Sequence, residues 1–139
     1  MVTPEQILLV QNSMRRIFPI RDTVARLFFS RLFWLDPSLR GVFHVDLEQQ
    51  GCKLMVALGF LAHGLNDLER NLPLVHQLGQ RHAGYGIEPR HYETVGAALL
   101  WALAQGQGED FTDDTRQAWV AAYSLLSSTM IEAATSKAA

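Results

Sequence analysis

The chain lacks the features that mark several large classes of protein. It has one cysteine, Cys52, among 139 residues, so an intrachain disulfide is excluded and a reducing compartment is expected. The longest apolar stretch runs from Leu54 to Ala62, with Gly59 inside it, and is far shorter than the ~18 residues of a membrane span. The first residues carry no basic-then-apolar signal pattern. These absences predict a cytoplasmic chain without a membrane span.

Neither sign of charge dominates the chain. Lys and Arg number 12 against 14 Asp and Glu, a formal net charge of −2, and the basic residues are scattered along the sequence. This distribution gives no indication of nucleic-acid binding. Hydrophobic residues make up 48% and charged residues 19%, which is typical of a globular protein. The length predicts a single domain, residues 1–139, around one core.

Helical periodicity runs through the sequence, and no segment alternates with period two for long enough to predict a strand. Thr3, Pro4 and Gln6 form a helix start signal with a capping box. A short segment is expected from Pro37 to near Gly41. Later helices are expected with Pro73 in the first turn, after Pro89, and after a cap at 112–114. The expected inner faces are Ile7, Val10, Met14 and Ile17; Val24, Phe28, Leu32 and Leu35; Leu54, Leu58, Leu61, Leu65 and Leu68; Tyr92, Val95, Leu99 and Leu103; and Trp119, Tyr123, Leu126 and Met130. The prediction is an all-α fold.

His82 closes an apolar stripe at the end of one of these segments. Leu74, Leu78 and His82 recur at i, i+4 and i+8, and Gly84 and Gly86 then end the helix. A lone histidine without cysteine or carboxylate partners does not suit zinc, which takes three or four protein ligands. It does suit haem iron, to which the protein contributes one axial imidazole. The alternative is a hydrogen-bonded core histidine.

Four segments resemble the globin family in order and spacing. Residues 32–39, followed by Val42 and Phe43, resemble the end of the second globin helix, the proline of the third and the phenylalanine that stacks on haem. Residues 78–82 and 85–87 resemble the proximal segment, and residues 91–96 and 118–123 the starts of the last two helices. The set is similar to single-domain bacterial haemoglobins, the globin domain of flavohaemoglobins and neuroglobin-like globins. It implies a three-over-three sandwich of about seven helices enclosing haem b.

The resemblance also implies which residues bind the haem. His82 would hold the iron through one ring nitrogen while the other donates to a nearby carbonyl. Phe43 would pack on the porphyrin, with an ordinary core position as the alternative. Gln50 and Leu54, one turn apart, would form the distal wall; a solvated Gln50 and a register with Gln49 as the distal residue are the alternatives. The other implied haem contacts are Phe29, Leu78, Ile87, Tyr92 and Val95.

Two positions depart from the flavohaemoglobin pattern. Phe29 stands where those proteins and most of their single-domain relatives place a ligand-binding tyrosine, and phenylalanine offers no donor. Tyr92 matches the tyrosine that braces the proximal histidine, but the accompanying glutamate falls on Ala134. Glu132 lies close by, yet two residues earlier it points around the helix toward another face. The missing carboxylate weakens the expectation of peroxidase-like chemistry.

The remaining histidines and the cysteine are expected to play smaller parts. His44 follows Phe43 directly and lies at the haem edge or in solvent, with ligation in a six-coordinate state as the alternative. His63 is expected to be too far from the iron, and His91 to point elsewhere. Cys52 is expected to be a small buried thiol.

The function implied by this resemblance is reversible binding of dioxygen, carbon monoxide and nitric oxide, for oxygen transport or nitric oxide scavenging. Nitric oxide dioxygenation is the enzymatic alternative, and it would need a separate reductase, because the sequence contains no glycine-rich βαβ fingerprint for a flavin or nicotinamide. A gas sensor and a haem-free interaction module with the same fold are further alternatives.

Overall fold

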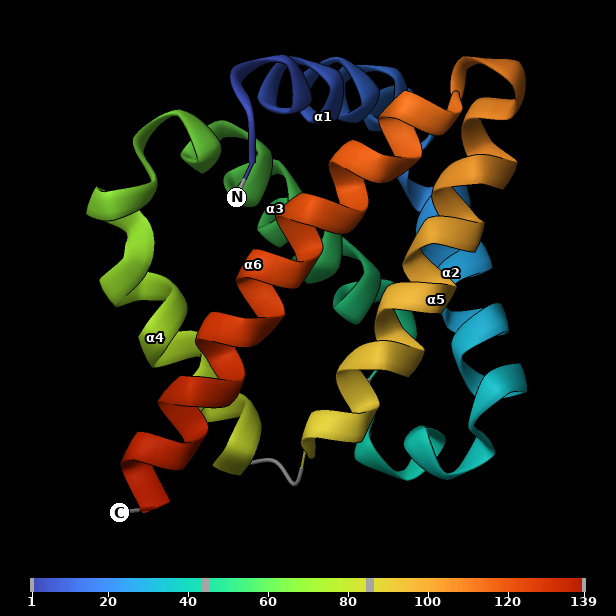
Figure 1. Ribbon diagram of the computed structural model, residues 1–139. Helices are drawn as coiled ribbons and strands as arrows, with labels where there is room; N and C mark the ends of the chain where they lie inside the picture. Colours follow the sequence, from blue (N-terminus) through green and yellow to red (C-terminus); the bar gives the residue numbers. More distant parts are fainter. Residues whose placement is uncertain (1, 44–45, 85–86, 139) are drawn as a thin grey trace.

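A computed structural model describes residues 2–43, 46–84 and 87–138, and this part of the chain is helical without any strand (Figure 1). The α-helices are α1 (Pro4–Ile17), α2 (Arg21–Leu35), α3 (Leu47–Gly64), α4 (Leu68–Gly84), α5 (Pro89–Gln107) and α6 (Asp113–Ala138). The 3₁₀ helices are η1 (Phe18–Ile20), η2 (Pro37–Val42), η3 (Leu65–Asp67) and η4 (Gly108–Asp110). Within the described residues there are thus six α-helices, and η2 lies where the short third segment was expected.

The six α-helices pack as two layers of three. The contacts across the layers are α1 on α6 and α5, α4 on α6, and α3 on α2, while α5 lies against both α2 and α6 within its own layer. In Figure 1, α6 crosses the front of the molecule between α4 and α5. The expected all-α globin sandwich is confirmed. Within the described residues, no helix combines the length and apolar character needed to cross a membrane.

The helix starts that rest on local signals lie where the sequence predicts them. Thr3 caps α1 through a complete capping box: its Oγ1 accepts from the Gln6 backbone N–H at 3.1 Å, and the Gln6 side chain accepts from the Thr3 N–H at 3.0 Å. Thr112 Oγ1 accepts the backbone N–H of Thr115 at 3.2 Å and caps α6. Both signals need only neighbouring residues, so tertiary contacts do not overrule them.

The boundary between α3 and α4 differs from the prediction. Pro73 lies inside α4, which begins five residues earlier at Leu68. The side-chain amide of Asn71 donates to the carbonyls of Gly64 at 3.3 Å and of Asp67 at 2.9 Å, so it ties the end of α3 to the first turn of α4. These hydrogen bonds stabilise the helical turn that precedes Pro73. The proline itself removes only one helical hydrogen bond, so the helix continues through it.

The core buries most of the predicted inner faces and contains one polar pair. Trp119 and Ser13 are fully buried, and the Trp119 indole N–H donates to Ser13 Oγ at 2.8 Å, which joins α6 to α1. A buried indole N–H needs such a partner. Leu35 and Leu74 are exceptions, because both are exposed despite their predicted inward positions.

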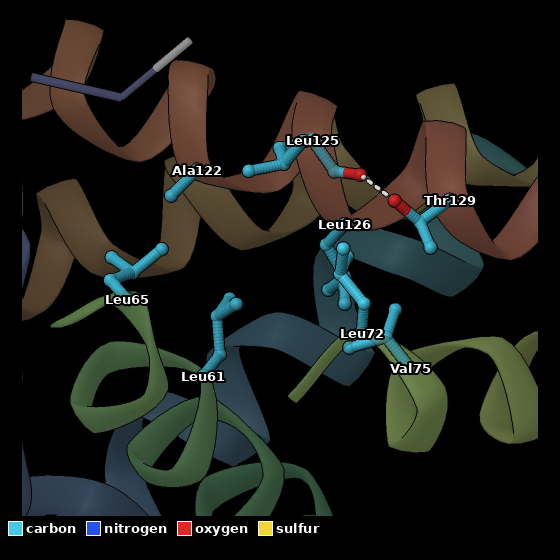
Figure 2. Close-up of a pocket in the computed structure, with 8 residues that line it drawn as sticks. All are labelled: Leu61, Leu65, Leu72, Val75, Ala122, Leu125, Leu126 and Thr129. Carbon is cyan, nitrogen blue, oxygen red and sulfur yellow. Dashed lines mark hydrogen bonds between the residues drawn. The ribbon is translucent and has the colours of Figure 1, made fainter. Parts of the chain in front are cut away.

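The junction of α3, α4 and α6 sets the position of the helix that carries His82. Figure 2 shows leucine side chains from all three helices meeting there, beside Thr129, whose hydroxyl donates to the Leu125 carbonyl at 2.9 Å. The space left between them is about 10 Å³, room for about one water molecule. The helix α4 is therefore closely packed against its neighbours.

Candidate functional site around His82

His82 lies in the last turn of α4, with one ring nitrogen already engaged. Its Nδ1 lies 2.8 Å from the backbone carbonyl oxygen of Leu78, one turn earlier. A carbonyl only accepts, so Nδ1 carries the proton and the Nε2 lone pair is available to a metal. No described residue forms a hydrogen bond with Nε2. The half-buried ring therefore has the tautomer and orientation of a metal-binding imidazole.

The chain after His82 is tied back to it. The Ile87 backbone N–H donates to the His82 carbonyl at 3.1 Å, so the backbone of Ile87 lies against the last turn of α4. Ile87 itself is half-buried. Tyr85 and Gly86, which belong to the proximal motif expected from the sequence, lie outside the described residues.

Close contact between α4 and α6 fixes the rotation of α4 about its axis. Gly79 is buried, and a Cβ there would lie 2.5 Å from the carbonyl oxygen of Met130. Leu74 precedes Gly79 by five residues, which places it roughly 140° around the helix from the α6 contact. Its side chain is accordingly 50% exposed, so the expectation of a buried stripe through Leu74, Leu78 and His82 is wrong at Leu74.

On the distal side, α3 crosses α2 closely at Gly51. A Cβ on Gly51 would lie 3.0 Å from the Ala25 Cβ and 3.8 Å from the Phe29 ring. With that face of α3 against α2, Gln50 and Leu54 share one flank and are both half-buried, whereas Gln49 is exposed. This arrangement favours Gln50 over Gln49 as the inward-facing amide. No hydrogen bond within the described residues joins Gln50 to His82.

Phenylalanine rings gather where α2 meets the chain after η2. The Phe29 and Phe43 ring centroids are 5.4 Å apart in edge-to-face contact, and Phe33 lies 5.9 Å from Phe29 and 5.8 Å from Phe43. Such contacts hold each ring in a defined orientation. Phe29 and Phe43, both predicted site residues, are therefore brought together. Phe33 was not singled out, although its spacing from Phe29 by one helical turn was a usable signal.

Tyr92 and Val95 approach the site from α5. Both are half-buried, and the Tyr92 carbonyl accepts the hydroxyl of Tyr123 on α6 at 2.7 Å. Burial raises the pKa of both phenols. Gly96, one turn after Tyr92, makes room for the Tyr123 ring, since a Cβ there would lie 2.8 Å from it. This packing fixes the start of α5 beside the end of α4.

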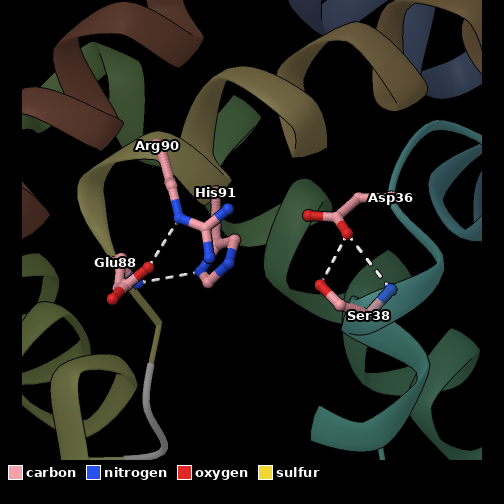
Figure 3. Close-up of polar contacts among 5 residues, drawn as sticks. All are labelled: Asp36, Ser38, Glu88, Arg90 and His91. Atoms are coloured by element: carbon pink, nitrogen blue, oxygen red, sulfur yellow. Dashed lines mark hydrogen bonds and ion pairs between the residues drawn. The ribbon is translucent and has the colours of Figure 1, made fainter.

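Two small groups of polar contacts lie at the start of α5 and at the start of η2 (Figure 3). His91 is only 5% exposed, and its Nδ1 accepts the Glu88 backbone N–H at 2.9 Å, so Nε2 carries the ring proton. Arg90 Nε donates to the Glu88 carboxylate at 2.6 Å and lowers its pKa. Across from them, Asp36 accepts from Ser38 Oγ at 2.6 Å and the Ser38 N–H at 3.1 Å, and these hydrogen bonds lower the Asp36 pKa.

The structural role of His91 was missed from the sequence, where it was expected only to point away from the iron. The available signal was Pro89 at the first helical position, which makes His91 the third residue of the helix and a capping position. The cap fixes the start of α5 and therefore the segment that carries Ile87, Tyr92 and Val95.

Cys52, His44 and the pair Glu132 and Ala134 complete the comparison with the sequence expectations. Cys52 is exposed, because it lies on the flank of α3 turned away from Leu54, so the predicted buried thiol is wrong. His44 lies outside the described residues. Glu132 is exposed and Ala134 half-buried, as expected for a chain without a proximal carboxylate at that position.

The residues present fit a haem better than a metal ion held by protein ligands alone. No group of three or more His, Cys, Asp or Glu side chains gathers within the described ranges in a way that could hold a metal. What the described residues offer is a single imidazole with a free Nε2 on α4 and, on other helices, phenylalanine rings and partly buried aliphatic side chains that include Leu54 and Val95. A porphyrin supplies the four remaining nitrogens that such a donor set requires.

Comparisons with known proteins agree with this arrangement. The family model described as Globin matches residues 26–130. A flavohemoprotein of Bordetella bronchiseptica is 30% identical over 134 residues, which cover 94% of this chain and 33% of that protein. A neuroglobin of Tetraodon nigroviridis is 31% identical over 118 residues, covering 75% of this chain and 74% of that protein. The chain thus spans about a third of the length of the flavohemoproteins that it matches.

Two solved structures share the fold at low sequence identity. One is an engineered carbene transferase described as a putative nitric oxide dioxygenase from Rhodothermus marinus, with a TM-score of 0.87 and 23% identity over 98% of this chain and 95% of that one. The other is a bacterial globin from Campylobacter jejuni, with a TM-score of 0.85 and 23% identity over 96% of this chain and 97% of that one. Family match, relatives and helix arrangement agree, and the chain belongs to the globin family.

Proposed function

We propose that the chain is a haem-b globin domain that reversibly binds dioxygen, carbon monoxide and nitric oxide. The observation that carries the proposal is the 2.8 Å hydrogen bond from His82 Nδ1 to the Leu78 carbonyl. It selects the tautomer whose Nε2 can bind iron, and it holds the ring on a helix that is packed against α6.

The residues proposed to surround the haem have different roles. Haem, when bound, supplies an iron that takes up diatomic gases. His82 holds the proximal side, and Phe29 and Phe43 form an apolar wall that excludes water. The Gln50 amide is the donor for a polar ligand on the distal side, with Leu54 one turn away.

The distal side has one donor where flavohaemoglobins have two, because Phe29 replaces the tyrosine. Its ring is buried against Phe28 and Phe43 and brings no hydroxyl. One hydrogen bond fewer to a polar ligand in a dry cavity is worth about 1–3 kcal/mol, or roughly tenfold to hundredfold in retention. We therefore expect faster dioxygen release than from a globin with both donors.

The proximal side favours gas binding over peroxidase-like chemistry. Glu132 is exposed and Ala134 has no carboxylate, so no glutamate of this helix segment increases the basicity of His82. The partner of Nδ1 is a backbone carbonyl, which is a weaker acceptor than a carboxylate.

The test is a visible absorption spectrum of the purified protein when ferric, when reduced, and after exposure to dioxygen and carbon monoxide. We expect a Soret band that shifts with each ligand and is lost in His82→Ala. His76→Ala, on the same helix, is the matched control and should keep the spectrum. A protein that stays colourless after haem is added, or a His82→Ala variant with an unchanged spectrum, would refute the proposal.

The enzymatic alternative is nitric oxide dioxygenation supported by a separate reductase. The 30% identity to a flavohemoprotein over nearly the whole chain motivates it. Rapid nitric oxide consumption after a reductase and a nicotinamide donor are added would favour the enzyme, whereas a stable gas complex without turnover would favour the carrier.

The exposed thiol of Cys52 is consistent with a cytoplasmic location, where thiols stay reduced.

A further inference from the structure

A groove between α1 and α3 lies apart from every residue assigned to haem binding. Its volume is about 470 Å³, within the range of small-molecule sites. Both helices and η1 contribute, and the lining residues include no acidic side chain among those that the structure describes. His82, Gln50 and Leu54, the residues proposed to surround the haem iron, do not line this groove.

The floor and walls of the groove are apolar. Met14, Met55 and Ala62 form buried parts of the lining, while Phe18 and Val56 stand at its edge. Phe18 is 59% exposed and Val56 is 73% exposed. Apolar surface of this kind beside an open groove favours an apolar occupant.

Polar groups gather around one contact between the two helices. The Gln11 side-chain amide donates to the Ala62 carbonyl at 3.0 Å. Arg15 follows Gln11 by one helical turn, and His63 follows Ala62 directly, so both belong to the same part of the lining. The groove therefore combines an apolar surface with a localised group of donors.

Arg15 is the unpaired cation of this group. Its guanidinium forms no ion pair or hydrogen bond with any residue in the described ranges. Arg21, which does not line the groove, is engaged by contrast: its guanidinium lies 4.4 Å from the Phe18 ring centroid and donates to the Phe18 carbonyl at 2.9 Å. A free guanidinium beside an apolar groove is complementary to an anionic head group on an apolar chain.

We propose that this groove binds a long-chain fatty acid, with its carboxylate at Arg15 and its hydrocarbon chain between α1 and α3. The acid is bound non-covalently and is distinct from the gas ligands. The charge of Arg15 selects the carboxylate, and the apolar lining supplies most of the binding free energy. The inference is independent of the proposed haem function.

Gly59 allows the groove to be filled without disturbing the core. It is part of the lining, and a Cβ at this position would meet no atom within 4 Å. Gly59→Leu therefore places an aliphatic side chain in the groove. For the head group, Arg15→Gln has a matched control in Arg16→Gln, the neighbouring exposed arginine that does not line the groove.

The experiment is isothermal titration calorimetry of the purified protein with dodecanoate, with dodecan-1-ol as the uncharged probe. We expect saturable 1:1 binding of dodecanoate, about threefold to fivefold weaker in Arg15→Gln, unchanged in Arg16→Gln and lost in Gly59→Leu. Dodecan-1-ol should bind the native protein about as weakly as dodecanoate binds Arg15→Gln. Visible absorption recorded on the same samples separates this site from ligands that reach the iron.

Three outcomes would overturn the inference. One is equal binding of acid and alcohol, and another is full binding by a folded Gly59→Leu variant. The third is binding to phosphatidylglycerol vesicles without binding to free dodecanoate, which would assign the surface to a membrane. A failure of haem binding would leave the calorimetric result unaffected, so the two proposals fail separately.

Discussion

Gly79 offers the sharpest test of how α4 is positioned. A Cβ there would lie 2.5 Å from the Met130 carbonyl oxygen, 2.6 Å from its Cα and 2.9 Å from its carbonyl carbon. Ordinary contacts between such atoms are about 3.5–4.0 Å, so Gly79→Ala forces an overlap of about 1 Å. All three atoms are backbone, and no side-chain rotation relieves the overlap. The helices α4 and α6 must move apart.

The size of the effect follows from two opposing terms. Alanine in a helix interior is favoured over glycine by about 1 kcal/mol. Overpacking costs about 1–3 kcal/mol, and the upper value applies here because the obstacle is backbone. The net loss is about 2 kcal/mol, or about 7 °C in Tm for a chain of this length.

Gly59→Ala is the matched control, because it lies inside α3 in open space. It should stabilise the protein by about 0.5–1 kcal/mol through helix propensity alone. Urea denaturation followed by far-UV circular dichroism measures both variants. If Gly79→Ala were as stable as Gly59→Ala, the close approach of α4 to α6 would be wrong, and with it the stated orientation of His82.

Three further predictions concern the distal side and single hydrogen bonds. In haem-loaded protein, Gln50→Leu should speed dioxygen loss roughly tenfold to hundredfold in stopped-flow measurements, while Gln49→Leu should leave it unchanged; equal effects would contradict the distal assignment. Ser13→Ala should cost about 1–3 kcal/mol in urea denaturation, because it leaves the buried indole N–H of Trp119 unpaired, and an unaltered midpoint would argue against that bond. His91→Ala should lower the free energy of unfolding by at least about 1 kcal/mol, whereas His91→Gln should lose much less, because glutamine offers an acceptor at the same cap position. Similar losses in both variants would show that the volume of the ring, and not the hydrogen bond, stabilises the start of α5.

Features decided by neighbouring residues were predicted well from the sequence. The capping box of Thr3 and Gln6 and the cap at Thr112 need no tertiary information. The all-α fold follows from the helical periodicity. The resemblance implied that one ring nitrogen of His82 donates to a nearby carbonyl, and the partner is the carbonyl of Leu78 in the same helix. These parts of the fold and site lie close to the residues that specify them.

Features decided by distant residues were not predicted. The exposure of Leu74 depends on which face of α4 meets α6, and that is set by Gly79 against Met130. Cys52 is exposed because α3 turns its Gly51 face toward α2. A sequence pattern shows which residues share a helical face, but the partner helix determines which face is buried.

The bond between Trp119 and Ser13 has a consequence for how the protein is made. Its two residues are 106 positions apart, so the buried hydroxyl of Ser13 on α1 gains its partner only after α6 has been made. Until then α1 can pack against α3 and α5, but its larger contact with α6 is missing. Synthesis at about 5–20 residues per second leaves α1 without α6 for several seconds. The part of α1 that packs against α6 therefore stays uncovered while the residues between the two helices are translated.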